Sequence, residues 1–166
     1  MFEAQEIFDK IPVSGNPAKD LLYQYGALID RSGDRKAAIA IMKRIVSKNP
    51  DHADALNYIG YSMVEEGHDY ERALSLIKKA DKLKPGNGYI VDSLAWANFR
   101  MGRLEEAWKQ IQRAVDLSKD DPTMWEHYGD IAAKLGHADK AKKGYRNALK
   151  YKHENPDSIK KKLGSK

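Results

Sequence analysis

The chain has 166 residues, of which 42% are hydrophobic and 32% are charged, and this is enough apolar surface for one globular domain with a core. The absence of cysteine excludes disulfide bonds, a thiolate nucleophile and a cysteine-ligated metal site. The net charge of +5 is unevenly spread, because residues 137–166 hold ten Lys or Arg against three Asp or Glu. The basic character is therefore a property of the C-terminal segment.

The sequence also limits how the protein can relate to a membrane. Its longest apolar runs are much shorter than the roughly 20 residues that a membrane-spanning helix requires. Residues 1–16 lack the basic and then apolar layout of a signal peptide. We therefore expect either a cytoplasmic protein or a piece of a longer chain.

Small residues recur along the chain with a period of 34 or 35 residues. Three series share this period: Gly33, Gly67, Gly102 and Gly136; Gly26, Gly60, Ala95 and Gly129; and Ala38, Ala73, Ala107 and Ala141. Because independent series with one period are the signature of stacked structural units, the sequence predicts a repeat architecture.

The repeated positions have distinct physical roles in the predicted helices. The first glycine series suits helix ends, where a left-handed residue is needed. Pairs such as Asn49-Pro50 and Asp121-Pro122 place a capping side chain before a proline, which favours a helix start. Glycine inside a helix costs roughly 1 kcal/mol relative to alanine, so the second series indicates close approach by a neighbouring helix. The sequence therefore predicts paired helices at 17–32 with 34–48, 51–66 with 69–83, 87–101 with 103–118, and 122–135 with 137–151.

In chain order, the first predicted element is a half repeat over 2–14, which contains a second helix only and carries Ala4, Phe8 and Ile11. Four full repeats follow, at 17–50, 51–86, 87–120 and 121–153. The last element is a capping helix over 155–163, with Ile159 and Leu163 on its buried side and lysines around them. We expect the chain to begin inside an array, as a fragment of a longer protein.

This pattern resembles the tetratricopeptide repeat, in which a large apolar residue, Leu, Gly and Tyr are followed by Ala, an aromatic residue, Ala and Pro over 34 residues. The second repeat matches it with Leu56, Ile59, Gly60, Met63, Ala73, Ile77, Ala80 and Pro85. The third and fourth repeats match except at the proline position, where they have Lys119 and His153. The resemblance implies an all-α fold, namely a right-handed superhelical array of antiparallel helix pairs, or α-solenoid.

A narrower resemblance concerns the source of the chain. Phrases such as "ALNYIGYSMVEEG" and "NGYIVDSLAWANFRMGRLEEA" are similar to the C-terminal repeats of larger bacterial tetratricopeptide proteins, some of which are exported lipoproteins. This resemblance implies a bacterial protein of the cytoplasm or the periplasm.

The sequence contains no recognisable constellation for catalysis. Its five histidines fall in no metal-ligand spacing, and it has no nucleophile elbow, phosphate-binding loop or dinucleotide fingerprint. Paired carboxylates such as Glu65-Glu66 and Glu105-Glu106 suit solvated faces or helix-dipole partners. We therefore predict a protein that is not an enzyme and that holds no cofactor and no metal.

The resemblance implies that the first helix of each repeat lines the concave side of the superhelix, where ligands of the family usually lie. The predicted partner-binding residues on this side are Tyr23, Asn57, Tyr58, Tyr61, Tyr89, Asp92, Trp96, Phe99, Arg100, Glu126, His127 and Asp130. Rigid aromatic residues with a polar surround are typical of the centre of a protein interface.

Helix 88–102 has two apolar faces, and they lead to different expectations. The Val91, Leu94 and Ala95 face is expected inside the array, and Trp108 and Trp125 are assigned to the core as well. The face with Tyr89, Trp96 and Phe99 is expected in the groove beside Tyr58 and Tyr61. The alternative is that Trp96, Phe99 and Tyr61 pack against neighbouring first helices.

The family's best-known mode of peptide binding clamps a C-terminal carboxylate with Lys, Arg and Asn. Those places hold Tyr23, Ala27, Tyr58, Tyr89 and Ser93 here, and the nearby charges are largely acidic. The sequence therefore disfavours a chaperone tail and favours an apolar or basic segment of a protein partner.

Three hypotheses for function remain at the level of the sequence. The leading one is a protein-interaction scaffold that binds a partner's helix or extended segment in the aromatic groove. The alternative is an adaptor whose basic end contacts nucleic acid or an anionic membrane through Lys140, Lys142, Lys143, Arg146, Lys150, Lys160, Lys161 and Lys162. No aromatic residue interleaves the lysine run, so nucleic acid is the less favoured partner. The third is self-association through Ile7, Phe8 and Ile11.

Overall fold

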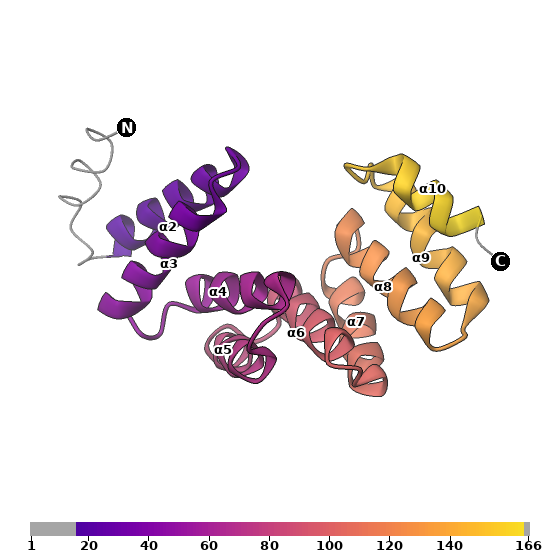
Figure 1. Ribbon diagram of the computed structural model, residues 1–166, viewed down its shortest axis with the longest axis horizontal. Coiled ribbons are helices and arrows are strands. Elements are labelled where there is room, and N and C mark those ends of the chain that lie inside the picture. Colours follow the sequence, from indigo (N-terminus) through magenta and orange to yellow (C-terminus); the bar gives the residue numbers. More distant parts are fainter. Residues whose placement is uncertain (1–15, 165–166) are drawn as a thin grey trace.

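The computed structural model describes residues 16–164, and over that span the chain forms nine α-helices and no strand (Figure 1). The helices are α2 (Asn16–Arg31), α3 (Arg35–Lys48), α4 (Ala53–Glu66), α5 (Tyr70–Leu83), α6 (Gly88–Arg100), α7 (Leu104–Leu117), α8 (Pro122–Lys134), α9 (Ala138–Lys150) and α10 (Pro156–Gly164). The predicted half repeat 2–14 and the self-association residues Ile7, Phe8 and Ile11 lie outside the described residues.

The helices pack in consecutive pairs, α2 with α3, α4 with α5, α6 with α7 and α8 with α9, and α10 packs on α9. The first helices of neighbouring pairs also meet, because α6 contacts both α4 and α8. Figure 1 shows the pairs following one another, so that α2 and α10 lie at opposite ends of the array. Each boundary of the eight paired helices lies within two residues of its prediction, and the all-α solenoid fold is confirmed.

The turns between paired helices follow the glycine series. Gly33, Gly67, Gly102 and Gly136 all have positive φ values, between 75° and 94°, which a residue with a side chain adopts only at a cost. One predicted capping residue is wrong: Asn49-Pro50 lies in the turn before α4, and the N-cap is His52, whose Nδ1 accepts from the Ala55 N–H at 3.2 Å. The Asn49 N–H instead bonds the Ile45 carbonyl and ends α3.

The glycines inside first helices lie where the paired helix comes closest. A β-carbon on Gly60 would lie 2.6 Å from Ile77 Cγ1 and 2.9 Å from the Ala73 carbonyl oxygen. A β-carbon on Gly129 would overlap the ring of Tyr145, and one on Gly144 would lie 2.6 Å from the backbone nitrogen of Gly129. Close approach at this register, as predicted, is therefore a property of the fold.

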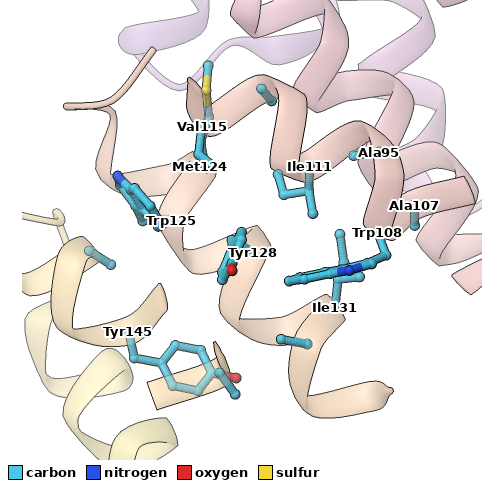
Figure 2. Packing of buried hydrophobic residues seen from close by; sticks show 14 of the residues in the cluster. Ala95, Ala107, Trp108, Ile111, Val115, Met124, Trp125, Tyr128, Ile131 and Tyr145 are labelled. Carbon is cyan, nitrogen blue, oxygen red and sulfur yellow. The ribbon is translucent and has the colours of Figure 1, made fainter. Parts of the chain in front are cut away.

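The core runs along the array between the helix layers. Figure 2 shows its C-terminal part, in which Trp108, Tyr128 and Ile131 come together from α7 and α8. Trp108 and Trp125 are each only 8% exposed, so their assignment to the core is confirmed. Trp125 also uses its polar edge, because Nε1 donates to the Lys119 carbonyl at 2.7 Å. The fully buried Ile159 joins the same cluster and seats α10 on the array.

The core assignment of Leu94 leads to a stability prediction. Leu94 is buried in the cluster that includes Leu56 and Ile77, so Leu94→Ala removes apolar contacts and leaves a cavity. We expect a loss of about 2–5 kcal/mol in the free energy of unfolding, measured by urea denaturation with circular dichroism. Leu117→Ala, at a position 46% exposed, is the matched control and should change it by less than about 0.5 kcal/mol. Similar losses for the two variants would contradict the assignment.

Candidate functional site

A hollow of about 350 Å³ lies over the first helices α2, α4, α6 and α8. Its lining residues are Tyr23, Asn57, Tyr58, Tyr61, Tyr89, Asp92, Ser93, Asp121, Thr123 and Met124. The structure thus brings Tyr23, Asn57, Tyr58, Tyr61, Tyr89 and Asp92 together from the predicted set. The other predicted residues, Trp96, Phe99, Arg100, Glu126, His127 and Asp130, do not line this hollow.

Tyrosines dominate this hollow, and they come from three helices in succession. Tyr89 is 61% exposed, whereas Tyr23, Tyr58 and Tyr61 are half-buried. Burial, assisted by the charge of Asp30 for Tyr58 and of Glu65 for Tyr61, raises the pKa of both phenols far above physiological pH. Their hydroxyls therefore stay neutral, and their rings offer apolar faces with a polar tip.

Asn57 adds an unusual feature to the same hollow. Its Oδ1 is buried and finds no hydrogen-bond partner among the residues that the structure describes. A buried acceptor without a partner costs about 1–3 kcal/mol.

Asp92 and His127 form a buried pair between successive first helices. His127 Nδ1 lies 2.9 Å and 3.1 Å from the two Asp92 carboxylate oxygens. The two residues are only 7% and 5% exposed, so the expectation that they display their side chains in an open groove is wrong. The reason is that α6 approaches α8 closely enough for the side chains to meet. Burial opposes the charge on His127, but Asp92 outweighs it and raises the pKa of His127.

Trp96 occupies the space between three helices. Its ring stacks on His127 with centroids 4.1 Å apart and on Phe99 at 5.1 Å. Its Nε1 donates to Glu65 Oε1 of α4 at 2.7 Å. The packing of Trp96 against neighbouring first helices, the alternative that the sequence left open, is therefore what the structure shows. Phe99 stacks on Trp96 of its own helix and packs against the C-terminal core cluster. Arg100 lies nearby, with its guanidinium 3.7 Å from the same Glu65 oxygen.

Glu126 and Asp130 are occupied by the last helix of the chain. Lys162 Nζ of α10 lies 2.7 Å from Glu126 Oε1 and 2.7 Å from Asp130 Oδ2. Burial opposes the charges, but the contacts with Lys162 lower the pKa of Glu126, and both carboxylates raise the pKa of Lys162. Lys162, which the sequence grouped with the basic end, is therefore paired with carboxylates of α8.

These contacts form a ladder of donors and carboxylates along the first helices, referred to below as the carboxylate ladder. Glu65 of α4 accepts from Trp96 of α6, Asp92 of α6 pairs with His127 of α8, and the carboxylates of α8 pair with Lys162 of α10. Each pair joins residues about one repeat period apart. The sequence carries this signal, because polar partners at that separation fall on adjacent first helices.

Within residues 16–164, no group of three or more His, Cys, Asp or Glu side chains is arranged to hold a metal ion. No helix in that span has the length and hydropathy needed to cross a membrane.

Comparison with known proteins gives consistent matches to one kind of repeat. The sequence model described as "Tetratricopeptide repeat" matches residues 30–88 and 93–158. A TPR repeat-containing protein of Pseudomonas aeruginosa is 32% identical over 117 residues, which is 70% of this chain and 18% of that protein. A protein O-mannosyl-transferase of Mus musculus is 28% identical over 122 residues, 71% of this chain and 13% of that one. The chain thus spans less than a fifth of the length of these two relatives.

A solved structure with the same architecture is that of Pseudomonas aeruginosa pilF. It superimposes with a TM-score of 0.72 at 18% identity, covering 87% of this chain and 65% of that chain. At this level of identity the likeness concerns the fold.

The packing of Trp96 predicts that Trp96 and Tyr89, two aromatic residues of α6, contribute differently to the free energy of unfolding. Trp96→Ala removes two ring contacts and the bond to Glu65, so we expect the free energy of unfolding to fall by roughly 2 kcal/mol or more. Tyr89→Ala, at an exposed position of the same helix, should change it little. Urea denaturation of both variants measures the difference. A Trp96→Ala variant as stable as Tyr89→Ala would rule out the packing role.

The buried pair predicts how stability depends on pH. Because the pKa of His127 is higher in the folded state than in the unfolded chain, its contribution is complete below the unfolded value of about 6.5. The contribution is lost as pH rises through the folded pKa. His127→Asn keeps a donor near Asp92 but does not titrate. The stability difference between wild type and variant should therefore shrink as the pH rises above about 6.5. Parallel urea-unfolding profiles for the two proteins would contradict this.

Proposed function

This chain belongs to the tetratricopeptide repeat family, and on that basis we propose that it is a non-catalytic scaffold that binds a peptide or helix of a partner protein on its concave face. Proteins of this family are generally interaction scaffolds, in which stacked helix pairs provide an extended surface for a ligand. The proposed binding surface is the tyrosine-lined hollow over the first helices.

The observation that carries the proposal is the tyrosine-lined hollow over α2, α4, α6 and α8. Four tyrosines from three consecutive first helices converge there, although they are far apart in the sequence. Tyrosine is enriched at the energetic centres of interfaces because it buries a large rigid ring and keeps a polar tip. Tyr89 in particular exposes most of its surface on a helix that is otherwise largely buried.

The chemistry of the hollow favours an apolar or basic segment as its ligand. Among the described residues that line it there is no lysine or arginine, so a carboxylate has no cation to pair with. Two aspartates line it: Asp121 is one, and the other, Asp92, is paired with His127.

The proposed site separates into two groups with different roles. Tyr23, Asn57, Tyr58, Tyr61 and Tyr89 are the residues proposed to contact the ligand. Trp96, Arg100, His127 and Asp92 join neighbouring first helices through the contacts described above, and Phe99 stacks on Trp96. Glu126 and Asp130 lie outside the hollow and belong to neither group, because both are paired with Lys162 of α10.

The proposal predicts which substitutions weaken ligand binding. Peptides selected from a random phage-displayed library against the full chain provide the probes. Tyr61→Ala and Tyr89→Ala should each lower the affinity of these peptides by about 2 kcal/mol, roughly 30-fold, as measured by isothermal titration calorimetry. Leu117→Ala, an exposed change on the second helix α7, is the control and should have no effect.

The tyrosine variants also need a check of folding, which urea denaturation supplies. If the selected peptides bind the folded tyrosine variants as tightly as wild type, the concave face is not their binding surface. Loss of affinity in Leu117→Ala alone would place the ligand on the outer layer of helices and contradict the proposal.

A further inference from the structure

The short helix α10 binds the end of the array through a simple pattern of side chains. Ile159 is fully buried against the core cluster of α8 and α9, and Leu163 packs at the edge of the same cluster. Lys162, three residues after Ile159, reaches the carboxylates of α8. An apolar residue followed by a lysine at i+3 and an apolar residue at i+4 lies on one face of a helix. This pattern is what the end of the array recognises.

The carboxylates that receive Lys162 are held in place by other residues. The Tyr145 hydroxyl of α9 donates to Asp130 Oδ1 at 2.9 Å. His153 Nε2 lies 2.8 Å from Oε2, the second oxygen of Glu126. The Lys162 ammonium then contacts Glu126 Oε1 and both Asp130 oxygens at 2.7–2.9 Å. Glu126, Asp130, Tyr145 and His153 therefore form a preorganised seat for a primary ammonium, referred to below as the lysine seat.

The helix that occupies the lysine seat, α10, is held by fewer buried residues than the helices that form the seat. α10 has nine residues and buries Ile159 alone, whereas each helix from α3 to α9 buries at least four residues. A helix of this length has little stability of its own, so it depends on the contacts of Ile159 and Lys162. Opening of α10 would expose the lysine seat and the apolar end of the array together.

We propose that the lysine seat binds, in trans, a helical segment of a partner protein with the pattern apolar-x-x-Lys-apolar, and that α10 is its built-in occupant. The partner displaces α10, places its lysine between Glu126 and Asp130, and covers the surface that Ile159 leaves. The partner's lysine is held by the opposite charges of Glu126 and Asp130. Its apolar residues pack on the neighbouring apolar surface and so orient the segment. This proposal stands apart from the tyrosine-lined hollow, because the two surfaces share none of their contact residues.

The experiment uses the full chain with α10 loosened by Ile159→Ala and Lys162→Gln together. The probe is a fluorescein-labelled peptide of residues 155–166, NPDSIKKKLGSK, and its binding is measured by fluorescence anisotropy. In wild type the tethered α10 competes at high effective concentration, so the peptide should bind the loosened chain at least about tenfold more tightly. Circular dichroism and urea denaturation establish that the loosened chain remains folded.

Matched peptides separate the lysine seat from general charge attraction. A peptide with Lys162→Gln should bind the loosened chain at least about tenfold more weakly, because its ammonium is lost from the seat. A peptide with Lys161→Gln has the same net charge and changes a residue that is exposed, so it should bind within about twofold of the original. In the receptor, Asp130→Asn should weaken binding, and Tyr61→Ala in the hollow should leave it unchanged.

Three results would overturn the proposal. The first is a folded loosened chain that does not bind the peptide, and the second is an equal loss for the two lysine variants of the peptide. The third is dimerisation of wild type on analytical ultracentrifugation that disappears in Lys162→Gln, because the partner would then be a second copy of this chain. Failure of the phage-selected peptides to use the tyrosines leaves this experiment unaffected, since its probe and its contact residues are different.

Discussion

The arrangement of this protein depends on how closely the two helices of each pair approach one another. At Gly60 and Gly129 no β-carbon fits, because the partner helix already occupies that space with Ile77, the Ala73 carbonyl and Tyr145. At the last pair, glycine faces glycine, since Gly144 lies against the backbone of Gly129. This tight pairing fixes the width of each unit, and the same pairing repeated along the chain brings first helix against first helix. The concave surface is a consequence of this stacking.

Where first helices meet, polar side chains join them. The carboxylate ladder of Glu65, Asp92, Glu126 and Asp130 runs along the concave side, and each step accepts a donor from the next helix. The Asp92 contact is buried and the Lys162 contacts are half-buried, so their loss leaves carboxylates without partners in a poorly solvated environment. The Glu65 contact is exposed. In this family of folds a surface residue of a first helix therefore has two competing uses. It either ties neighbouring repeats together or stays open to a ligand.

The two uses are divided along the array. Toward the N-terminal end of the described chain, Tyr23, Tyr58, Tyr61 and Tyr89 leave a hollow whose lining is open. Toward the C-terminal end, Trp96, His127 and Lys162 fill the equivalent space with contacts between repeats. The proposed ligand groove and the proposed lysine seat are thus two regions of one surface, one of them open and the other occupied by the chain itself.

The sequence by itself determined the period, the helix pairs and the inner layer. The recurrence of small residues every 34 or 35 positions predicted the helix boundaries to within two residues, and it placed Val91, Leu94, Trp108 and Trp125 in the core. These features follow from local rules, namely helical periodicity and the conformational demands of glycine, which act within one or two helices. The sequence also predicted that the tyrosines of the hollow lie on one side of the array, because the register of each first helix determines which of its residues point to the concave side.

Only the tertiary structure decided which concave residues are free. Asp92, Trp96, Glu126, His127 and Lys162 have the composition of a binding surface, yet each contacts a side chain of another first helix or of α10. Which side chain meets which depends on the distance and angle between consecutive helix pairs, and on whether a long side chain spans that gap. The distance and angle between helix pairs arise from packing over the whole array. Residues of the same chemical type therefore form contacts between repeats at one place and stay accessible to a ligand at another.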